Sequence, residues 1–142
     1  IATELHSAGQ HADSLYIKNS VWHEGRSQFL QMTGKDVFRH ATSKLGHMVD
    51  ALLEASGMSS DDIDWLVPHQ ANKRIIDAIA KKLKMSDEKI IQTIQHHGNT
   101  SSASVPLALD FAVQSGRIKR GDCLFLEAFG GGYAWGATLL RY

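Results

Sequence analysis

The apolar side chains of this chain repeat with two different periods, which predicts a fold of alternating helices and strands. Between Lys35 and Ser56 they recur every three or four positions, so that they share one face of a helix. Gly57 predicts the end of that helix. The same spacing predicts helices over 71–83 and 102–115. Pro106 must lie in the first turn of the latter, because a proline inside a helix costs about 3 kcal/mol.

Short apolar and β-branched runs between these helices predict strands. The candidate strands are 15–17, 29–32, 65–67, 123–128 and 134–141. A polar loop from Asn19 to Gln28 separates the first two, Pro68 ends the third, and the last two form a hairpin across three glycines. The run 90–94 is consistent with either a strand or a short turn. Strands that alternate with helices, together with a terminal hairpin, imply an α/β domain with a mixed sheet.

The composition excludes several classes of function. The 142 residues suffice for one domain with a real core. The fifteen basic and fifteen acidic side chains balance, so the chain has no net positive charge that would favour binding to nucleic acid or to an anionic membrane surface. No apolar run reaches the ~20 residues that span a bilayer, and the first six residues do not resemble a signal peptide. The single cysteine, Cys123, fits a reducing cytoplasm, and its apolar strand predicts a buried, inert thiol.

Two neutral hydrogen-bond donors lie where strands give way to helices. His69 follows the strand 65–67, and Asn99 precedes the helix over 102–115. Two such donors that converge on one oxygen form an oxyanion hole, which stabilises charge developing in a transition state. The dipole of the helix after His69 disfavours a protonated imidazole. Two ordinary roles remain open: a helix-entry histidine satisfied by backbone groups, and an asparagine that caps a helix.

The glycine triplet Gly130-Gly131-Gly132 has two possible roles. It can form a tight turn, or its bare amides can approach a ligand closely, and three glycines in succession favour the second role. No serine lies in a Gly-x-Ser-x-Gly elbow, so the sequence shows no convincing nucleophile. These residues therefore predict one half of an active site.

The helix over 71–83 carries several basic side chains interrupted by Asp77. Such a cluster is either a solvated face with a local ion pair or a docking patch for an acidic partner or a phosphate. The eight histidines have no metal-ligand spacing, since His96 and His97 are adjacent and His40 and His47 lie two turns apart. We therefore expect no metal site.

Three motifs, in this order, resemble β-ketoacyl-acyl carrier protein synthase III, a thiolase-fold condensing enzyme of bacterial type II fatty acid synthesis. They are His69-Gln70-Ala71-Asn72, Gly98-Asn99-Thr100-Ser101 and the closing run from Leu126 to Gly136. The resemblance runs along the whole chain but covers only the C-terminal half of such an enzyme. It implies that residues 1–142 form one C-terminal thiolase-like domain. The N-terminal half, which carries the cysteine nucleophile, is absent from this sequence.

The resemblance also implies a reaction. A short acyl group moves from coenzyme A to the cysteine, and malonyl-carrier protein then loses carbon dioxide and attacks the acyl thioester. His69 and Asn99 would hold the malonyl thioester oxygen, and the amide of Gly131 would hold the acyl carbonyl. The acyltransferase would need no cofactor or metal beyond its coenzyme A and phosphopantetheine thioesters. The 142 residues alone would be inactive and prone to aggregate.

Binding residues follow from the same resemblance. Gly34, Phe38, Ala71 and Asn72 would line the pantetheine tunnel, while Arg74, Arg39, Lys81 and Lys82 would dock the acidic acyl carrier protein. The implied partners are this carrier protein, the N-terminal half and a second copy in a homodimer. Two alternatives stay open: a condensing enzyme of quinolone or polyketide starter type, and a non-catalytic half-domain that binds a carrier protein.

Overall fold

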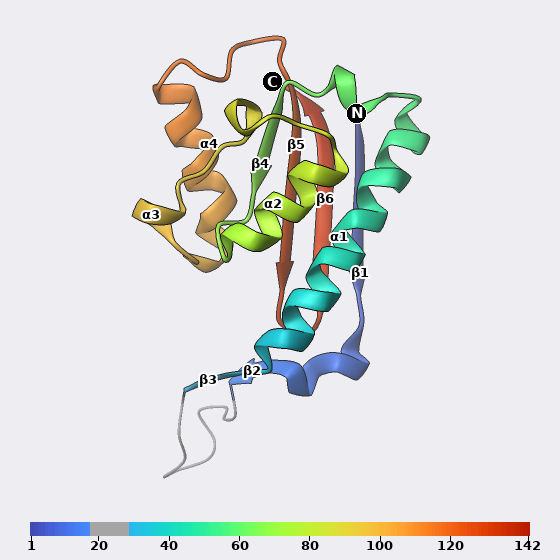
Figure 1. Cartoon of the computed structure of the whole chain (residues 1–142), viewed down its shortest axis with the longest axis vertical. Coiled ribbons are helices and arrows are strands. Elements are labelled where there is room, and N and C mark those ends of the chain that lie inside the picture. Colours follow the sequence, from blue (N-terminus) through green and yellow to red (C-terminus); the bar gives the residue numbers. More distant parts are fainter. Residues whose placement is uncertain (18–28) are drawn as a thin grey trace.

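A computed structural model describes residues 1–17 and 29–142. Four strands form a mixed sheet in the order β1 (Ala2–Ser7), β6 (Ala134–Arg141), β5 (Cys123–Gly130) and β4 (Trp65–Pro68) (Figure 1). β4 and β5 run parallel, and the other pairs are antiparallel. A separate ribbon pairs β2 (Leu15–Ile17) with β3 (Leu30–Met32). The predicted loop from Asn19 to Gln28 falls outside the described residues.

The helix α1 (Gly34–Ser56) confirms the long helix predicted from the apolar period. Its buried residues include Ala41, Leu45 and Leu52, which lie on the predicted apolar face. Gly57 ends the helix with φ 66°, in the left-handed region that glycine adopts at little cost. A 3-10 turn follows it at Ser60–Asp62.

Two helices begin later than the sequence predicts. α2 (Lys73–Lys82) begins at Lys73 rather than Ala71, because the Asn72 side chain accepts a hydrogen bond from the backbone N–H of Arg74 at 2.9 Å and caps the helix. α4 (Ser104–Gln114) follows a 3-10 turn at Ser101–Ala103. Pro106 is its third residue, so the prediction that this proline lies in the first turn is confirmed.

The terminal hairpin is confirmed, since β5 and β6 pair without a break from Cys123 with Arg141 to Gly130 with Ala134. β1, by contrast, is a strand that the sequence did not predict. Its polar and apolar residues do not alternate cleanly, and it becomes a strand by pairing with β6, about 130 residues away in sequence. The ambiguous run 90–94 forms a single bridge between Ile90 and Leu66, then enters the short helix α3 (Ile94–His97).

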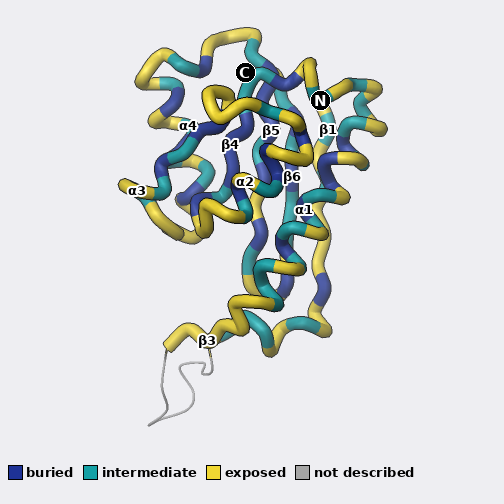
Figure 2. Tube along the Cα trace, viewed as in Figure 1, coloured by how far each residue is buried: buried dark blue, intermediate teal, exposed yellow. Residues whose placement is uncertain are grey.

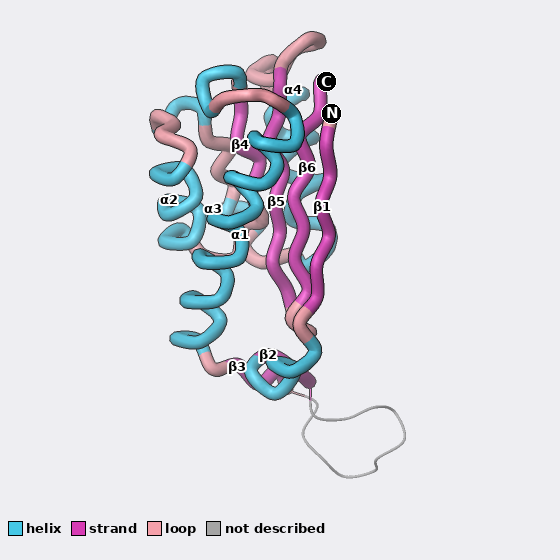
Figure 3. Tube along the Cα trace, turned by 90° about the vertical axis from the view of Figure 1, so that its right-hand side faces the viewer, coloured by secondary structure: helices cyan, strands magenta, loops and turns pink. Residues whose placement is uncertain are grey.

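Helices cover both faces of the sheet. One apolar cluster joins α1 and α2 to the side of β5 that bears Cys123 and Phe125, and a second joins α4 to the side that bears Leu124 (Figure 3). Further 3-10 turns lie at Gly9–Ser14 and Asp87–Lys89. No helix within 1–17 or 29–142 is long and apolar enough to cross a membrane. Parallel β4 and β5 end at the same edge of the sheet, where α/β proteins commonly bind ligands.

Candidate active site

A cavity of about 1040 Å³ opens at the edge where β4 and β5 end. Its wall is largely apolar and includes residues of β1, β2, β3, β5 and β6 and of the helices α1, α2 and α4. His69, Asn99 and Gly131 all line this cavity, although they are far apart in the sequence. The fold therefore brings together the three residues to which we assigned oxygen-binding roles.

His69 and Asn99 lie on neighbouring loops whose backbones are fixed by hydrogen bonds. The N–H of His69 donates to the carbonyl of Glu127 on β5 at 2.8 Å, and the N–H of Asn99 donates to the carbonyl of Gln70 at 2.9 Å. The two side chains are close enough that Asn99 influences the pKa of His69. Asn99 does not cap α4, and its φ of 51° sets it in a left-handed turn that asparagine tolerates. The ordinary capping role left open for Asn99 is therefore not observed.

The His69 ring is held in its neutral form. Burial lowers its pKa below the ordinary value of 6.5, and the interaction with the Asn99 side chain opposes this only in part. The direction agrees with the sequence prediction, but burial rather than the dipole of α2 is its largest cause. A neutral imidazole keeps one N–H donor and adds no charge to the cavity. The neutral side chains of His69 and Asn99, each with an N–H group that can donate, thus line the same cavity.

Glu127 is a cavity residue that the sequence analysis missed as a chemical group. It lies in β5 with 3% of its surface exposed, and burial raises the pKa of its carboxyl from 4.5 to about 8. The carboxyl is therefore protonated at neutral pH. Its Oε2 atom has no hydrogen-bond partner among the described residues. The available signal was the charged residue inside the apolar run Cys123–Gly130.

The glycine triplet serves both as a turn and as cavity wall. Gly132 has φ 131°, which L side chains rarely adopt. A Cβ atom on Gly131 would lie 3.1 Å from the carbonyl oxygen of Leu15, so a side chain there would crowd the β2 backbone. Gly131 therefore presents bare backbone to the cavity.

The four residues assigned to the pantetheine tunnel separate into two groups. Ala71 and Asn72 line the cavity. Gly34 and Phe38 do not line it and lie in the first turns of α1, where the guanidinium of Arg74 stacks 4.7 Å from the Phe38 ring centroid. Gly34 and Phe38 thus lie at the start of α1, next to the cavity rather than in its wall, and their assignment to the tunnel stays a prediction.

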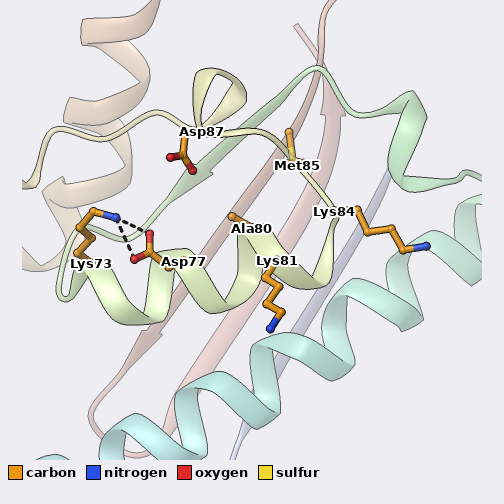
Figure 4. A pocket seen from close by; sticks show the side chains of 7 residues that line it. All are labelled: Lys73, Asp77, Ala80, Lys81, Lys84, Met85 and Asp87. Atoms are coloured by element: carbon orange, nitrogen blue, oxygen red, sulfur yellow. Dashed lines mark hydrogen bonds and ion pairs between the residues drawn. The ribbon is translucent and has the colours of Figure 1, made fainter.

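The four residues assigned to carrier docking are exposed on α1 and α2. Arg39 pairs with Asp36 at 3.0 Å, and Lys82 pairs with Asp50 at 2.6 Å. A second hollow of about 530 Å³ lies along α2, with Lys81 in its wall. Lys73 and Asp77 form an ion pair there at 2.7 Å (Figure 4), which is the local ion pair predicted for this face. This hollow holds solvated charges and none of the predicted catalytic groups.

Comparison with known proteins identifies the family. The model of the 3-oxoacyl-[acyl-carrier-protein (ACP)] synthase III C-terminal family matches residues 53–142. The chain belongs to this family. A relative named β-ketoacyl-[acyl-carrier-protein] synthase III, from Coxiella burnetii, is 55% identical over 98% of this chain. That stretch is 44% of the relative, so the chain spans less than half the length of the curated relatives it matches.

Solved structures of the family confirm the α/β thiolase-like fold predicted from the sequence. The 3-oxoacyl-[acyl-carrier-protein] synthase III from Aquifex aeolicus superposes with a TM-score of 0.91 at 38% identity, covering 99% of this chain and 44% of that one. The priming β-ketosynthase of the R1128 polyketide pathway superposes with a TM-score of 0.89 at 33% identity, over 98% and 43%. No group of three or more potential metal ligands occurs within residues 1–17 and 29–142.

Proposed function

We propose that this chain is the C-terminal half of a β-ketoacyl-acyl carrier protein synthase III, in which His69 and Asn99 stabilise the enolate of a malonyl thioester. One observation supports the proposal: the neutral His69 ring and the Asn99 carboxamide line one cavity in a chain of this family. The acyltransferase starts fatty acid synthesis and draws on no cofactor beyond its thioester substrates.

The donors act when malonyl thioester loses its carboxylate. The bond between the α-carbon and the carboxylate breaks, carbon dioxide leaves, and the electron pair spreads onto the thioester oxygen. N–H groups of His69 and Asn99 donate to that oxygen as its charge develops, so they stabilise the transition state more than the ground state. A protonated imidazole would bind the malonyl carboxylate and oppose its loss.

Carbon–carbon bond formation completes the reaction. The enolate carbon attacks the carbonyl carbon of the acyl thioester, and the cysteine thiolate of the N-terminal half leaves. The backbone amide of Gly131, with the amide of the nucleophile, holds the acyl oxygen. Cys123 is unsuited to this role, because it is fully buried and burial raises the pKa of its thiol.

The N-terminal half covers the apolar side chains that this chain exposes around the cavity. They include Leu5, Ile17, Leu30 and Met32, which are 57–79% exposed on β1, β2 and β3. Large exposed apolar residues in one region are typical of an interface. The isolated chain is accordingly inactive, and the complete enzyme is a cytoplasmic homodimer.

The substrate arm enters beside Ala71 and Asn72 and passes Phe38 and Gly34 at the start of α1. The acyl carrier protein docks outside, on Arg74 together with Arg39, Lys81 and Lys82. The stacking of Arg74 on Phe38 supports this arrangement, since it joins the docking surface to the tunnel mouth. An acidic carrier fits this exposed basic face.

The test separates the two half-reactions in the full-length protein that contains this chain. His69→Ala and Asn99→Ala should each lower malonyl decarboxylation on the order of 100-fold, the usual effect of removing one oxyanion donor. Acyl transfer from coenzyme A should change less than about threefold. His47→Ala, which removes an exposed histidine of α1, is the matched control. Equal losses in both half-reactions would contradict the proposed roles.

A second candidate is a starter condensing enzyme of polyketide or quinolone type, which the likeness to the R1128 priming ketosynthase favours. It uses the same enolate chemistry with another acyl group. A panel of acyl-coenzyme A substrates distinguishes the two by the rate of acyl transfer. Carrier binding without release of carbon dioxide would instead indicate a non-catalytic half-domain.

A further inference from the structure

Gln70, between His69 and the cap of α2, is completely buried although its side chain is polar. Buried amides are stable only when their donors and acceptors find partners. The hydrogen bonds of Gln70 reach three segments distant from it in the sequence. This makes it unlike its neighbours Ala71 and Asn72, which are exposed.

The backbone of Gln70 holds the Asn99 segment at its far end. Its carbonyl accepts from the N–H of Asn99 at 2.9 Å, and its N–H donates to Oγ of Ser104 at 2.7 Å. Ser104 is fully buried and begins α4. Because Asn99 has a left-handed backbone, its direction depends on the bonds that hold the turn.

The side chain of Gln70 holds the other end of the same segment. Its Nε2 donates to the carbonyls of Pro68 at 2.9 Å and Ile91 at 3.0 Å, and its Oε1 accepts from the N–H of Thr93 at 2.8 Å. Every donor and acceptor group of Gln70 is therefore used. The segment from Ile91 to Ser104, which carries Asn99, is attached to Gln70 at both ends.

We infer that Gln70 is a positioning residue that sets the spacing of the His69 and Asn99 donors. His69 is covalently next to Gln70, and Asn99 is tied to its carbonyl, so one buried residue fixes both donors relative to each other. The inference rests on the proposed function, since it assigns Gln70 an effect through those two donors. An apolar side chain of similar length would leave the N–H of Thr93 and the carbonyl of Ile91 unpaired and release the segment.

A double-mutant cycle in the full-length protein tests this role. Gln70→Met should lower kcat for malonyl decarboxylation on the order of 10- to 100-fold, as expected when a catalytic group is displaced by about 1 Å. KM for malonyl-carrier protein and the rate of acyl transfer should change less than about threefold. In a His69→Ala, Asn99→Ala background, Gln70→Met should change decarboxylation less than about twofold, because the groups it positions are gone.

Two further variants keep the test decisive. Trp65→Phe removes the 2.8 Å bond from Nε1 to Asp122 at the opposite end of β4 and controls for a general loss of stability. Ser104→Ala removes one tie to Gln70 and should give a smaller loss of the same kind. It carries the test if Gln70→Met does not fold.

An equal loss in both backgrounds, or a Trp65→Phe loss as large as that of Gln70→Met, would overturn the inference. Full activity of Gln70→Met beside an inactive His69→Ala would overturn it while leaving the proposed function intact. Full decarboxylation by His69→Ala would instead overturn the proposed function.

Discussion

Polar groups at the cavity edge and on the outer face of α2 are held in opposite ways. At the cavity edge, Gln70 is buried and bonded to four backbone groups and a hydroxyl. On α2, Lys73 and Asp77 form an ion pair with both side chains about half exposed. Figure 2 shows the same contrast, with β4 buried and the outer turns of α2 exposed. Exposed pairs contribute ~0–1 kcal/mol, whereas an unpaired buried group costs ~1–3 kcal/mol. The exposed charged side chains of α2 are therefore separate from the buried, fully hydrogen-bonded polar group beside the cavity.

The largest expected effect is on the pH dependence of stability, and it should differ between the buried carboxyl of Glu127 and the exposed carboxyl of Asp77. Burial raises the pKa of Glu127 from 4.5 to about 8, so folding takes up a proton between these values. The folded state is favoured below pH 4.5 and loses stability as pH rises through about 8. Glu127→Gln lacks this proton uptake, so its unfolding free energy relative to wild type should increase by about 3 kcal/mol from pH 4.5 to pH 7.

Urea unfolding at several pH values measures this change. Asp77→Asn, at an exposed carboxyl, is the control and should shift the unfolding free energy by less than about 1 kcal/mol. A pH-independent difference between Glu127→Gln and wild type would show that Glu127 is ionised in the folded protein.

A second prediction concerns the backbone that precedes Asn99. A Cβ atom on Gly98 would lie 2.9 Å from the carbonyl oxygen of Ile94, which forces the loop to shift. Gly98→Ala should lower decarboxylation about 10-fold or more by displacing the Asn99 donor. Gly46→Ala meets nothing within 4 Å in α1 and should stabilise the protein by about 1 kcal/mol without loss of rate. If Gly98→Ala kept the wild-type decarboxylation rate, the prediction would be wrong, because the loop that carries Asn99 would tolerate displacement.

The smallest effect is expected on the exposed face. Arg74→Glu should raise KM for malonyl-carrier protein about 10-fold, because it reverses a charge on the proposed docking surface. Decarboxylation of malonyl-coenzyme A, which lacks the carrier, should change much less. Lys119→Glu makes the same charge change at an exposed turn before β5. A similar rise in KM for both variants would mean that net charge, and not a local docking site, determines affinity.

Sequence patterns predicted the parts of the fold that depend on local spacing. The period of α1, its glycine stop and the hairpin of β5 and β6 are examples. β1 could not be predicted, because its strand conformation depends on pairing with β6 at the other end of the chain. The start of α2 was misplaced because Asn72 could be read either as a helical residue or as its cap.

The candidate site was predictable to a similar degree. The motifs around His69 and Asn99 indicated two donors, and the fold sets both on one cavity. The hydrogen bonds of Gln70 could not be predicted from the sequence, since its partners lie up to 34 residues away. The state of Glu127 was also hidden, because its pKa depends on burial by the complete fold.

The pH dependence of malonyl decarboxylation tests most directly whether His69 acts as a neutral donor. The measurement uses the full-length protein without acyl substrate, in a Glu127→Gln background that removes the buried carboxyl of the cavity. Because burial lowers the pKa of His69, the rate should stay constant from pH 8 to pH 6.5 and fall only at lower pH. A rate that rises as pH falls through 6.5 would mean that the charged imidazolium is the donor, and would contradict the account.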